Sequence, residues 1–351
     1  MRVLVAMSGG VDSSVAAGLL CEQGHEVIGV TLQLYDHGAA TGRKGSCCAG
    51  QDIADARRVA GRLGIPHYVL DAEARFHDAV IEDFAATYAA GRTPVPCIRC
   101  NQSVKFADLT ALARDLGAER LATGHYVRRE DGKDGPELHR AADARRDQSW
   151  FLAMTTPEQL ALALFPLGAM ADKEVVRAHA ARLGLPVAAK PDSQDICFVP
   201  AGDHASLVGA LRPQALLPGE IVDETGTVLG THQGLARYTV GQAKRLGLPA
   251  HDAGQRVVTR IEPGANRIVV GPREGGARLV RLAEPNWLTA PVPRRLTVKL
   301  RSGEAPREAA LVPDGDSLAV LLDAPARAAP GQACVLYDGT RVLGGGFIAA
   351  D

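Results

Sequence analysis

The chain has 351 residues, of which 46% are hydrophobic and 23% charged, and its formal net charge is −1. This length predicts two or three domains, and the composition is typical of a soluble globular protein. The near-neutral charge excludes a polycation, although a local basic surface is enough to bind nucleic acid. No apolar run approaches the roughly 20 residues of a membrane-spanning helix, so we expect a cytoplasmic protein without a membrane partner. Seven cysteines in such a protein favour thiol chemistry or metal binding over a disulfide framework.

The N-terminal segment predicts a strand, a glycine-rich turn and a helix. An apolar run at 3–5 precedes Ala6-Met7-Ser8-Gly9-Gly10-Val11-Asp12-Ser13, and a helix-like stretch follows at 14–20. Adjacent glycines let backbone N–H groups turn inward, and a helix N-terminus carries partial positive charge, so the loop suits an anion. The Gly-Lys-Ser/Thr ending of a Walker A loop is missing. The pattern Ser-Gly-Gly-x-Asp-Ser instead resembles the PP-loop of ATP pyrophosphatases, which cleave ATP between the α and β phosphates and adenylate an oxygen.

Strands and helices alternate through the first half of the chain. The predicted strands are 3–6, 27–32, 68–70 and 121–122, and the predicted helices are 51–63, 73–90 and 103–116. This alternation predicts a parallel α/β sheet with ligands at the carboxyl ends of its strands, where the N-terminal loop and Thr123-Gly124-His125 fall. A helical stretch is expected from about 148 to 183, and an exposed loop at Gly132–Pro136.

Beyond about residue 201 frequent turn signals separate short apolar runs, which predicts small β-rich domains. The runs are 256–261, 267–270, 296–300, 318–322 and 333–337. The fold class is therefore α/β: a PP-loop domain at 1–200, a central β-rich domain at 201–268 and a C-terminal β-barrel at 269–351. The stretch Arg267–Glu308 holds nine Arg or Lys residues against four Glu residues, which makes it a candidate basic surface for nucleic acid, with a solvated charged face as the alternative.

Three cysteines stand in segments that suggest chemistry. Cys97-Ile98-Arg99-Cys100 follows two prolines and precedes the helix expected from Ser103, and a thiol near a helix N-terminus has a lowered pKa. Cys197 closes the segment Asp192-Ser193-Gln194-Asp195-Ile196-Cys197. A zinc site would need a second C-x-x-C or a histidine pair, which the sequence lacks.

Several segments together resemble the bacterial tRNA-specific 2-thiouridylase family along nearly the whole chain. They are 8–13, 93–94, 100–101, 122–126, 147–152, 192–198, 238–242 and 344–346. The resemblance implies a sulfurtransferase that uses ATP and Mg²⁺ to adenylate the C2 oxygen of the wobble uridine of tRNA. Sulfur from a cysteine persulfide then replaces that oxygen to give 2-thiouridine. The implied partners are the anticodon region of tRNA and a cysteine desulfurase or sulfur-relay protein.

The resemblance also implies roles for individual residues. Cys197 carries the sulfur, Cys100 is the nucleophile that releases it as a disulfide forms, and Cys97 is an auxiliary thiol. The ATP-binding set is Ala6, Met7, Ser8, Gly9, Gly10, Val11, Asp12, Ser13, Leu32 and Gly124. The tRNA-binding set is Val95, Pro96, Cys97, His125, Arg146, Asp147, Gln148, Arg301, Ser302 and Gln332.

The chain departs from the family pattern at two places, and some assignments stay open. Many members have an Asp with an expected base role at the position of Cys97, and many have Arg-Tyr where this chain has Arg301-Ser302. Asp12 is either a ligand on the Mg²⁺ side or the N-cap of its helix. Tyr126 and Trp150 either stack on the target base or belong to the core.

Three alternative functions remain at this point. Cys97, Cys100 and Cys197 could ligate a [4Fe-4S] cluster that leaves one iron open to sulfide. The chain could instead be a PP-loop synthetase that acts on a small molecule, although this would need neither β-rich domains nor paired cysteines. A non-catalytic tRNA-binding module is the third alternative, and the intact PP-loop argues against it.

Overall fold

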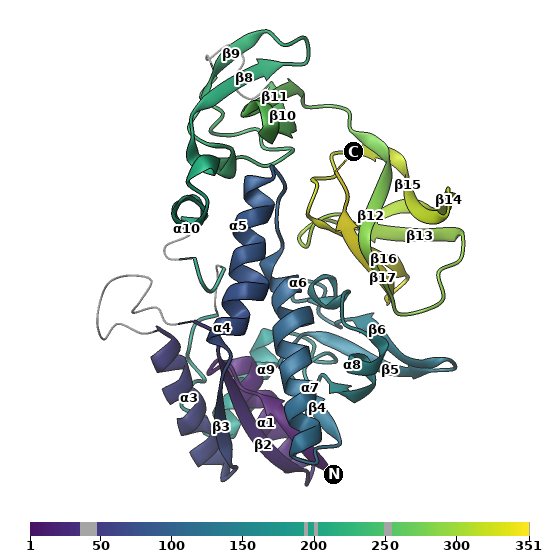
Figure 1. The fold of residues 1–351 in the computed structure, drawn as a ribbon. Helices are drawn as coiled ribbons and strands as arrows, with labels where there is room; N and C mark the ends of the chain where they lie inside the picture. The colour runs from purple at the N-terminus through teal and green to yellow at the C-terminus, as the bar shows by residue number, and fades with distance from the viewer. Residues whose placement is uncertain (36–47, 193–195, 200–202, 249–254, 351) are drawn as a thin grey trace. The chain divides into compact units, whose positions relative to one another are not determined.

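The structure is a computed structural model that describes the chain apart from residues 36–47, 193–195, 200–202, 249–254 and 351 (Figure 1). The chain forms two compact units, which we describe separately. Unit 1 comprises Met1–Ala79, Cys97–Phe198 and Thr340–Leu343, and unit 2 comprises Val80–Pro96, Val199–Gly339 and Gly344–Asp351. In the described part of the chain, no helix has both the length and the apolar character needed to span a membrane.

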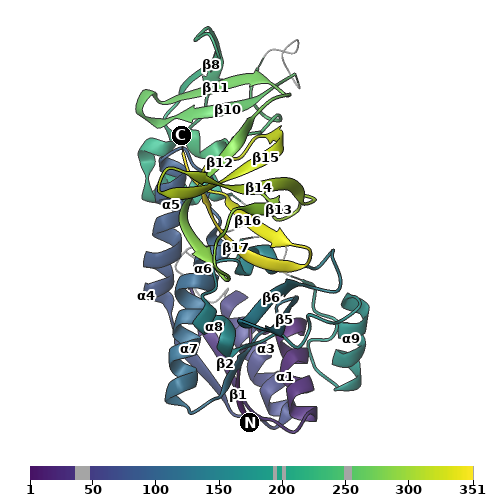
Figure 2. The ribbon, with the colours of Figure 1, turned by 90° about the vertical axis from the view of Figure 1, so that its right-hand side faces the viewer.

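Unit 1 is built on a five-stranded parallel sheet with the strand order β3-β2-β1-β4-β7. The strands are β1 (Arg2–Ala6), β2 (Glu26–Gln33), β3 (His67–Asp71), β4 (Arg120–Ala122) and β7 (Ala163–Leu164). Figure 2 places α7 (Phe106–Asp115) on one side of this sheet and α1 (Val11–Glu22), α3 (Cys48–Leu63) and α9 (Lys173–Arg182) on the other. The parallel α/β sheet predicted from the alternation of strands and helices is therefore confirmed.

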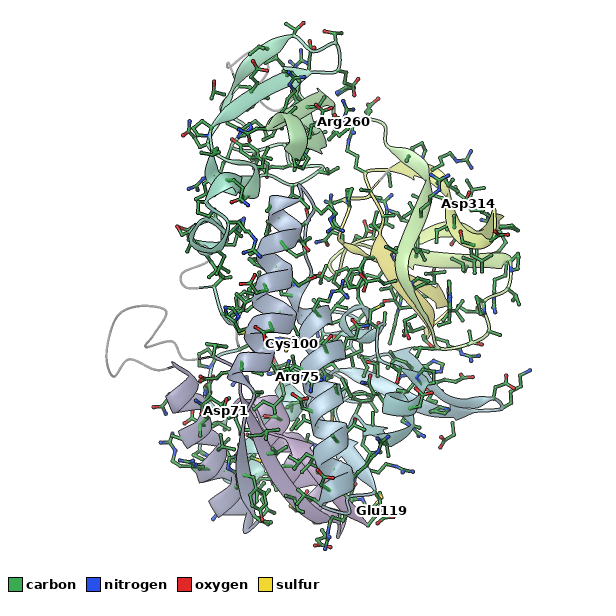
Figure 3. The ribbon with its side chains drawn as sticks, in the orientation of Figure 1. Asp71, Arg75, Cys100, Glu119, Arg260 and Asp314 are labelled. Carbon is green, nitrogen blue, oxygen red and sulfur yellow. The ribbon has the colours of Figure 1, made fainter. Side chains whose placement is uncertain are left out.

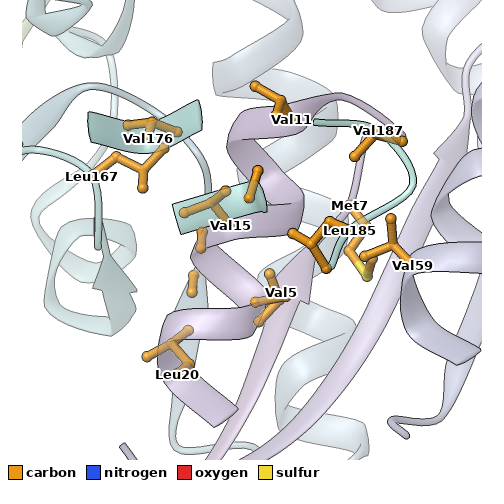
Figure 4. Packing of buried hydrophobic residues seen from close by; sticks show 14 of the residues in the cluster. Val5, Met7, Val11, Val15, Leu20, Val59, Leu167, Val176, Leu185 and Val187 are labelled. Carbon is orange, nitrogen blue, oxygen red and sulfur yellow. The ribbon is translucent and has the colours of Figure 1, made fainter. Parts of the chain in front are cut away.

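The core of unit 1 lies between β1 and the layer of α1, α3 and α9 (Figure 4). Val5 of β1 and Val15 of α1 are fully buried there. A Cβ atom at Gly18 would lie 2.6 Å from Leu183 Cδ1, so α1 approaches the end of α9 closely only because residue 18 has no side chain. This packing fixes α1, and with it the loop that precedes α1.

Two further predictions for unit 1 need correction. The helix predicted from Ser103 begins earlier, because α6 (Pro96–Cys100) and a π-helical turn, η2 (Asn101–Lys105), precede α7. The stretch 148–183 is not one helix. It contains η3 (Ser149–Leu152), α8 (Pro157–Leu162), β7 and α9. A capping box at Thr156 and a proline at the first position of α8 start a new helix, which the apolar pattern alone does not reveal.

The expected exposed loop at 132–136 is the turn of a hairpin between β5 (Val127–Gly132) and β6 (Gly135–Arg140). Lys133 and Asp134 form the turn and are exposed. The flanking strands escaped prediction because charged residues occupy much of β5, so the period-two apolar signal is absent.

Unit 2 contains a four-stranded sheet with the order β10-β11-β8-β9 and a closed barrel of six strands, β12 to β17. The sheet strands are β8 (Gly219–Asp223), β9 (Val228–His232), β10 (Arg256–Glu262) and β11 (Arg267–Pro272). The barrel strands are β12 (Ala277–Trp287), β13 (Arg294–Lys299), β14 (Arg307–Asp314), β15 (Ser317–Ala326), β16 (Ala333–Asp338) and β17 (Arg341–Ile348). Pairing of β12 with β17 closes the barrel, as the sequence predicted for the last β-rich region.

The described helical elements of unit 2 are short, and α5 and α10 are the longest with 8 residues each. They are α5 (Glu82–Ala89), α10 (His204–Leu211), η5 (Pro213–Leu216), η6 (Leu235–Arg237) and η7 (Pro263–Ala265). Unit 1 also contains α4 (Glu73–Phe76), and the π-helical segment η1 (His77–Ile81) separates α4 from α5 in the chain. The region predicted as a helix at 73–90 is thus helical, with a π-helical segment in its middle.

Candidate active site

The glycine-rich loop of unit 1 leads from β1 into α1, is hydrogen-bonded to β2 and packs closely on α3. The Met7 amide donates a 2.7 Å hydrogen bond to Val30 O, and Thr31 Oγ1 donates one of 2.7 Å to Met7 O. Gly9 has φ +72°, and a Cβ atom at that position would collide with Asp52 O of α3. Only glycine combines this backbone conformation with such close packing.

Hydrogen bonds between a side chain and the backbone stabilise the conformation of the loop. Ser13 Oγ accepts a hydrogen bond from the Ser8 amide at 3.0 Å and donates one to Gly10 O at 3.3 Å. A Cβ atom at Gly124 would lie 2.6 Å from the Ser13 amide nitrogen, so the end of β4 meets the first turn of α1. Leu32 stands near the end of β2. The structure therefore places the residues that the family resemblance assigns to ATP at the ends of the neighbouring strands β1, β2 and β4.

The Asp12 carboxylate lies at the start of α1 but does not cap it, because Gly10 is the N-cap and makes no side-chain cap bond. The N-cap alternative for Asp12 is therefore wrong. The Lys173 ammonium donates to both Asp12 oxygens, at 2.7 and 2.8 Å, and the Tyr126 hydroxyl donates to Oδ1 at 2.6 Å. Burial and the bond to Asp12 raise the pKa of Tyr126, so this hydroxyl remains a donor. Tyr126 and Trp150 are both buried, as the core interpretation expected.

The contacts of Lys173 continue to the segment that precedes Cys197. Its ammonium lies 2.8 Å from Asp192 Oδ1, and the Arg146 guanidinium donates to Asp192 Oδ2 at 2.7 Å. Although burial opposes the charged form, these two cations hold the pKa of Asp192 below its ordinary value. Asp12, Lys173, Asp192 and Arg146 thus form one continuous charged chain of contacts.

A second lysine contacts the loop backbone. The Lys190 ammonium donates to Gly9 O at 3.0 Å, to Asp52 Oδ1 at 2.7 Å and to Asp55 Oδ2 at 2.5 Å. Neither Lys173 nor Lys190 was identified from the sequence. Both are distant from the loop in the chain, and the only available signal was that Lys190 stands two residues before Asp192.

Three thiols and one lysine elsewhere in unit 1 form the second part of the candidate site. Cys97 and Cys197 are exposed, whereas Cys100, at the end of α6 (Figure 3), is buried. The half-buried Lys105 interacts electrostatically with all three. The turn η2 explains this placement, because a π-helix joins residues i and i+5 and so sets Lys105 one turn after Cys100. Arg75 braces the turn by donating to Ser103 O at 3.2 Å. No motif in the sequence marks Lys105 as part of this site.

Desolvation by neighbouring protein atoms has the largest effect on the acidity of two of these thiols. It raises the pKa of the buried Cys100, and it raises the pKa of Cys197 to about 11 although part of that side chain reaches the surface, while Lys105 acts in the opposite direction on both. The lowered thiol pKa predicted from a helix N-terminus is therefore wrong for Cys100. Its helix begins at Pro96 rather than Ser103, so Cys100 lies within the helical run and is only 5% exposed.

The resemblance also predicts tRNA-binding residues in unit 1, and three of them are His125, Asp147 and Gln148. His125 Nδ1 lies 2.8 Å from Thr123 Oγ1, and its ring stacks on Phe106. Burial, aided by Lys105, lowers the pKa of His125 to about 3, so the ring is neutral. Asp147 accepts hydrogen bonds from Ser149, and Gln148 Oε1 accepts one of 2.8 Å from the Tyr126 amide.

The predicted tRNA residues of unit 2 fall in two places. Val95 and Pro96 are buried, and Gln332 Nε2 donates to the carbonyls of Thr93 and Pro94 at 3.5 Å. Arg301 and Ser302 are exposed, and Arg301 donates to Val240 O at 3.3 Å.

The basic surface expected at 267–308 carries less free charge than its composition suggests. Carboxylates pair with most of its arginines. The pairs are Arg267 with Glu220, Arg281 with Asp314, Arg294 with Asp338, Arg295 with Asp323 and Arg307 with Glu304. A count along the sequence could not reveal these partners, since four of the five come from other segments of the chain.

Within the described residues, no three His, Cys, Asp or Glu side chains form a group that could hold a metal ion. Cys97, Cys100 and Cys197 are all described, so the structure does not arrange them as the ligands of a cluster.

Comparisons with known proteins agree along the length of the chain. The family models match as a tRNA methyl transferase HUP domain at residues 1–201, a tRNA methyl transferase PRC-barrel domain at 208–272 and an aminomethyltransferase beta-barrel domain at 277–348. Among solved structures, a 4-thiouridine synthetase–RNA complex with bound ATP covers 60% of this chain and 50% of its own. Its TM-score of 0.38 and 19% identity are too low to support an argument.

Curated relatives are much more similar. A tRNA-specific 2-thiouridylase MnmA from Acidiphilium cryptum is 70% identical over 350 residues, which cover 99% of this chain and 100% of the relative. The protein of that name from Gluconobacter oxydans is 61% identical over 360 residues, covering 100% of this chain and 99% of the relative. On these matches the chain belongs to the tRNA-specific 2-thiouridylase family.

Proposed function

We propose that the chain is an ATP-dependent tRNA 2-thiouridylase that converts the wobble uridine of tRNA to 2-thiouridine. The observation that carries this proposal is the presence, in one compact unit, of a glycine-rich loop at the start of a helix and of three thiols that interact electrostatically with Lys105. The names of the full-length relatives support the same activity. A synthetase for small molecules is disfavoured because the family match includes both β-rich regions.

The first half-reaction belongs to the loop at Ala6–Ser13 with Leu32 and Gly124. The C2 oxygen of uridine attacks the α-phosphorus of ATP, and pyrophosphate leaves. The inward-facing loop amides and the start of α1 would hold the phosphates. Asp12 is the carboxylate of the loop and suits Mg²⁺, which neutralises phosphate charge. Adenylation turns a poor leaving oxygen into one that departs with AMP.

The second half-reaction belongs to the thiols. A sulfur donor, either a cysteine desulfurase or a relay protein, would load the exposed Cys197 as a persulfide, Cys–S–SH. The Cys100 thiolate attacks Cys197 Sγ, the inner sulfur of the persulfide, so that the Cys100–Cys197 disulfide forms, the bond to the outer sulfur breaks, and hydrosulfide leaves. Hydrosulfide attacks C2 of the adenylated uridine and AMP departs. The Cys100–Cys197 disulfide that remains must be reduced by an external thiol before the next turnover.

The remaining assignments define where tRNA would bind. Val95, Pro96, Cys97, His125, Arg146, Asp147, Gln148, Arg301, Ser302 and Gln332 would contact it. The target base must leave the anticodon stack to reach a pocket, as in other enzymes that modify bases. A neutral His125 stacked on Phe106 suits contact with a base better than contact with a phosphate. We keep the domain assignment of 1–200, 201–268 and 269–351 as part of this proposal.

Mass spectrometry of tRNA after reaction with ATP and a sulfur donor tests the function. We expect an exchange of oxygen for sulfur at the wobble uridine, with release of pyrophosphate. Asp12→Ala should abolish pyrophosphate release while tRNA binding persists, and Glu22→Gln at the other end of α1 is the matched control. Unmodified tRNA, together with pyrophosphate release driven by a small acid, would point to a different PP-loop activity.

A further inference from the structure

The nucleotide loop lacks the positive charge that its proposed ligand requires. Between Ala6 and Ser13 the only ionisable side chain is Asp12, which is negative. Phosphate-binding loops of the Walker type include a lysine that reaches the phosphates, and this loop has none. A triphosphate beside Asp12 would meet like charge, so any cationic side chain that binds it alongside Mg²⁺ must come from elsewhere in the fold.

Two ammonium groups contact the loop among the described residues, and their surroundings differ. Lys190 holds a backbone carbonyl, Gly9 O, and its other two bonds go to Asp52 and Asp55. The three donors of this ammonium are thus all used to tie the loop to α3. Lys190 therefore has a structural role.

Lys173 has a different set of partners. It is the first residue of α9, directly after the N-cap Asp172, and its side chain is 9% exposed. Its bonds go to side chains alone, to both oxygens of Asp12 and to Asp192. When Lys173 releases Asp12, its bond to Asp192 remains, and Asp12 keeps the hydrogen bond from the Tyr126 hydroxyl and is 32% exposed. Lys173 can therefore exchange Asp12 for another anion without leaving a buried charge unpaired.

We propose that Lys173 is the phosphate-binding lysine of this enzyme, and that it exchanges its bonds to Asp12 for bonds to the triphosphate when nucleotide enters the loop. This inference rests on the proposed use of ATP. It assigns to α9 the role that a Walker loop gives to a lysine of its own. The buried position matters, since an ammonium held close to the phosphates in a region poor in water interacts more strongly than an exposed one.

Equilibrium binding of two nucleotides separates this role from a structural one. The probes are α,β-methylene-ATP, which cannot be cleaved between the α and β phosphates, and AMP. We expect Lys173→Met to weaken binding of the triphosphate by about tenfold or more and to leave AMP binding nearly unchanged. Lys173→Arg, which keeps the charge, should recover part of the loss. Lys190→Met should weaken both nucleotides alike, because it loosens the loop itself.

Arg182→Met is the matched control on the same helix, since Arg182 pairs with Glu22 at the surface, away from the loop. An unchanged preference for triphosphate over AMP in Lys173→Met would overturn the inference, as would an equal loss for both nucleotides. If Lys173→Met fails to fold, the affinity for α,β-methylene-ATP relative to that for AMP is measured in Lys173→Gln and Lys173→Arg instead, and the same outcomes apply. If the wild-type chain binds neither nucleotide, the proposed function itself fails.

Discussion

Lys105 follows Cys100 by one π-helical turn, and its ammonium acts electrostatically on that buried thiol. The same ammonium acts on Cys197, whose pKa is raised to about 11 through desolvation by neighbouring protein atoms, although part of its side chain reaches the surface. A sulfur reaction requires thiolate, and burial alone would make thiolate scarce at neutral pH. Lys105 is therefore the group that offsets burial in this cluster.

The alkylation rate of Cys197 should consequently rise about tenfold per pH unit between pH 7 and 10, since only the thiolate reacts and its fraction grows with pH below the pKa. Lys105→Met removes the cation that lowers the pKa, so alkylation at a given pH should slow. Mass spectrometry of iodoacetamide-labelled peptides measures both effects. Lys133→Met, on an exposed hairpin turn, is the control. Equal rates in Lys105→Met and wild type would contradict this role.

Cys100→Ser and Cys197→Ser should each stop thiolation while leaving pyrophosphate release intact. The thiols and the ATP loop lie on different segments, and serine cannot carry or release sulfane sulfur. Parallel assays of tRNA thiolation and pyrophosphate measure the separation. Cys334→Ser is the control, because Cys334 is a fully buried core residue of unit 2. Loss of pyrophosphate release in both active-site variants would mean that the thiols serve adenylation.

Gly124→Ala should lower both stability and nucleotide affinity. Its Cβ atom would lie 2.6 Å from the Ser13 amide nitrogen and displace the loop, and overpacking of this kind costs about 1–3 kcal/mol. Gly61→Ala on α3 is the matched control, because a Cβ atom there meets nothing within 4 Å. In a helix that change should be neutral or stabilising. The Tm of each variant is measured with and without nucleotide. Equal Tm values for Gly124→Ala and Gly61→Ala would refute the packing argument.

What could be predicted from the sequence depended on how local each signal was. The N-terminal loop could be predicted because its glycines, serines and flanking apolar runs stand within one strand–turn–helix unit. Lys173 could not, since it lies 161 residues from Asp12 and meets it only after α9 packs on α1. The lowered pKa predicted for Cys100 failed for a related reason. The segments α6 and η2 extend the helical run backward to Pro96, and no apolar period marks a five-residue π-helical turn.

The basic stretch at 267–308 illustrates the same limit, because its arginines find carboxylates on other strands. Arg301 differs, since its bond in the described residues goes to the Val240 carbonyl and it stays exposed. We therefore expect Arg301→Ala to weaken tRNA binding and to reduce the slope of log affinity against log salt by about 0.7–0.9, the effect of one phosphate contact.

Arg295→Ala is the control for this measurement, because Asp323 already neutralises Arg295. Filter binding at several salt concentrations gives both slopes. Truncation from Asn266 onward would be a poorer test, since it removes β11 from between β10 and β8. An unchanged slope in Arg301→Ala would show that Arg301 makes no phosphate contact.

Cys97→Asp distinguishes the persulfide route from an iron–sulfur cluster held by three cysteines. It restores the residue common in the family, so in the persulfide route the variant should keep much of its activity and contain no iron. In the cluster route, a hard carboxylate replaces a soft thiolate, and iron and activity should fall together. The measurements are iron content and visible absorption after anaerobic purification, together with tRNA thiolation.

Because Cys97 is exposed and its side chain lies at the surface of α6, the substitution should not disturb folding, and Cys97→Ser serves as the control. An active, iron-free Cys97→Asp enzyme would exclude an obligatory three-cysteine cluster. Inactivity together with loss of iron would count against the persulfide route.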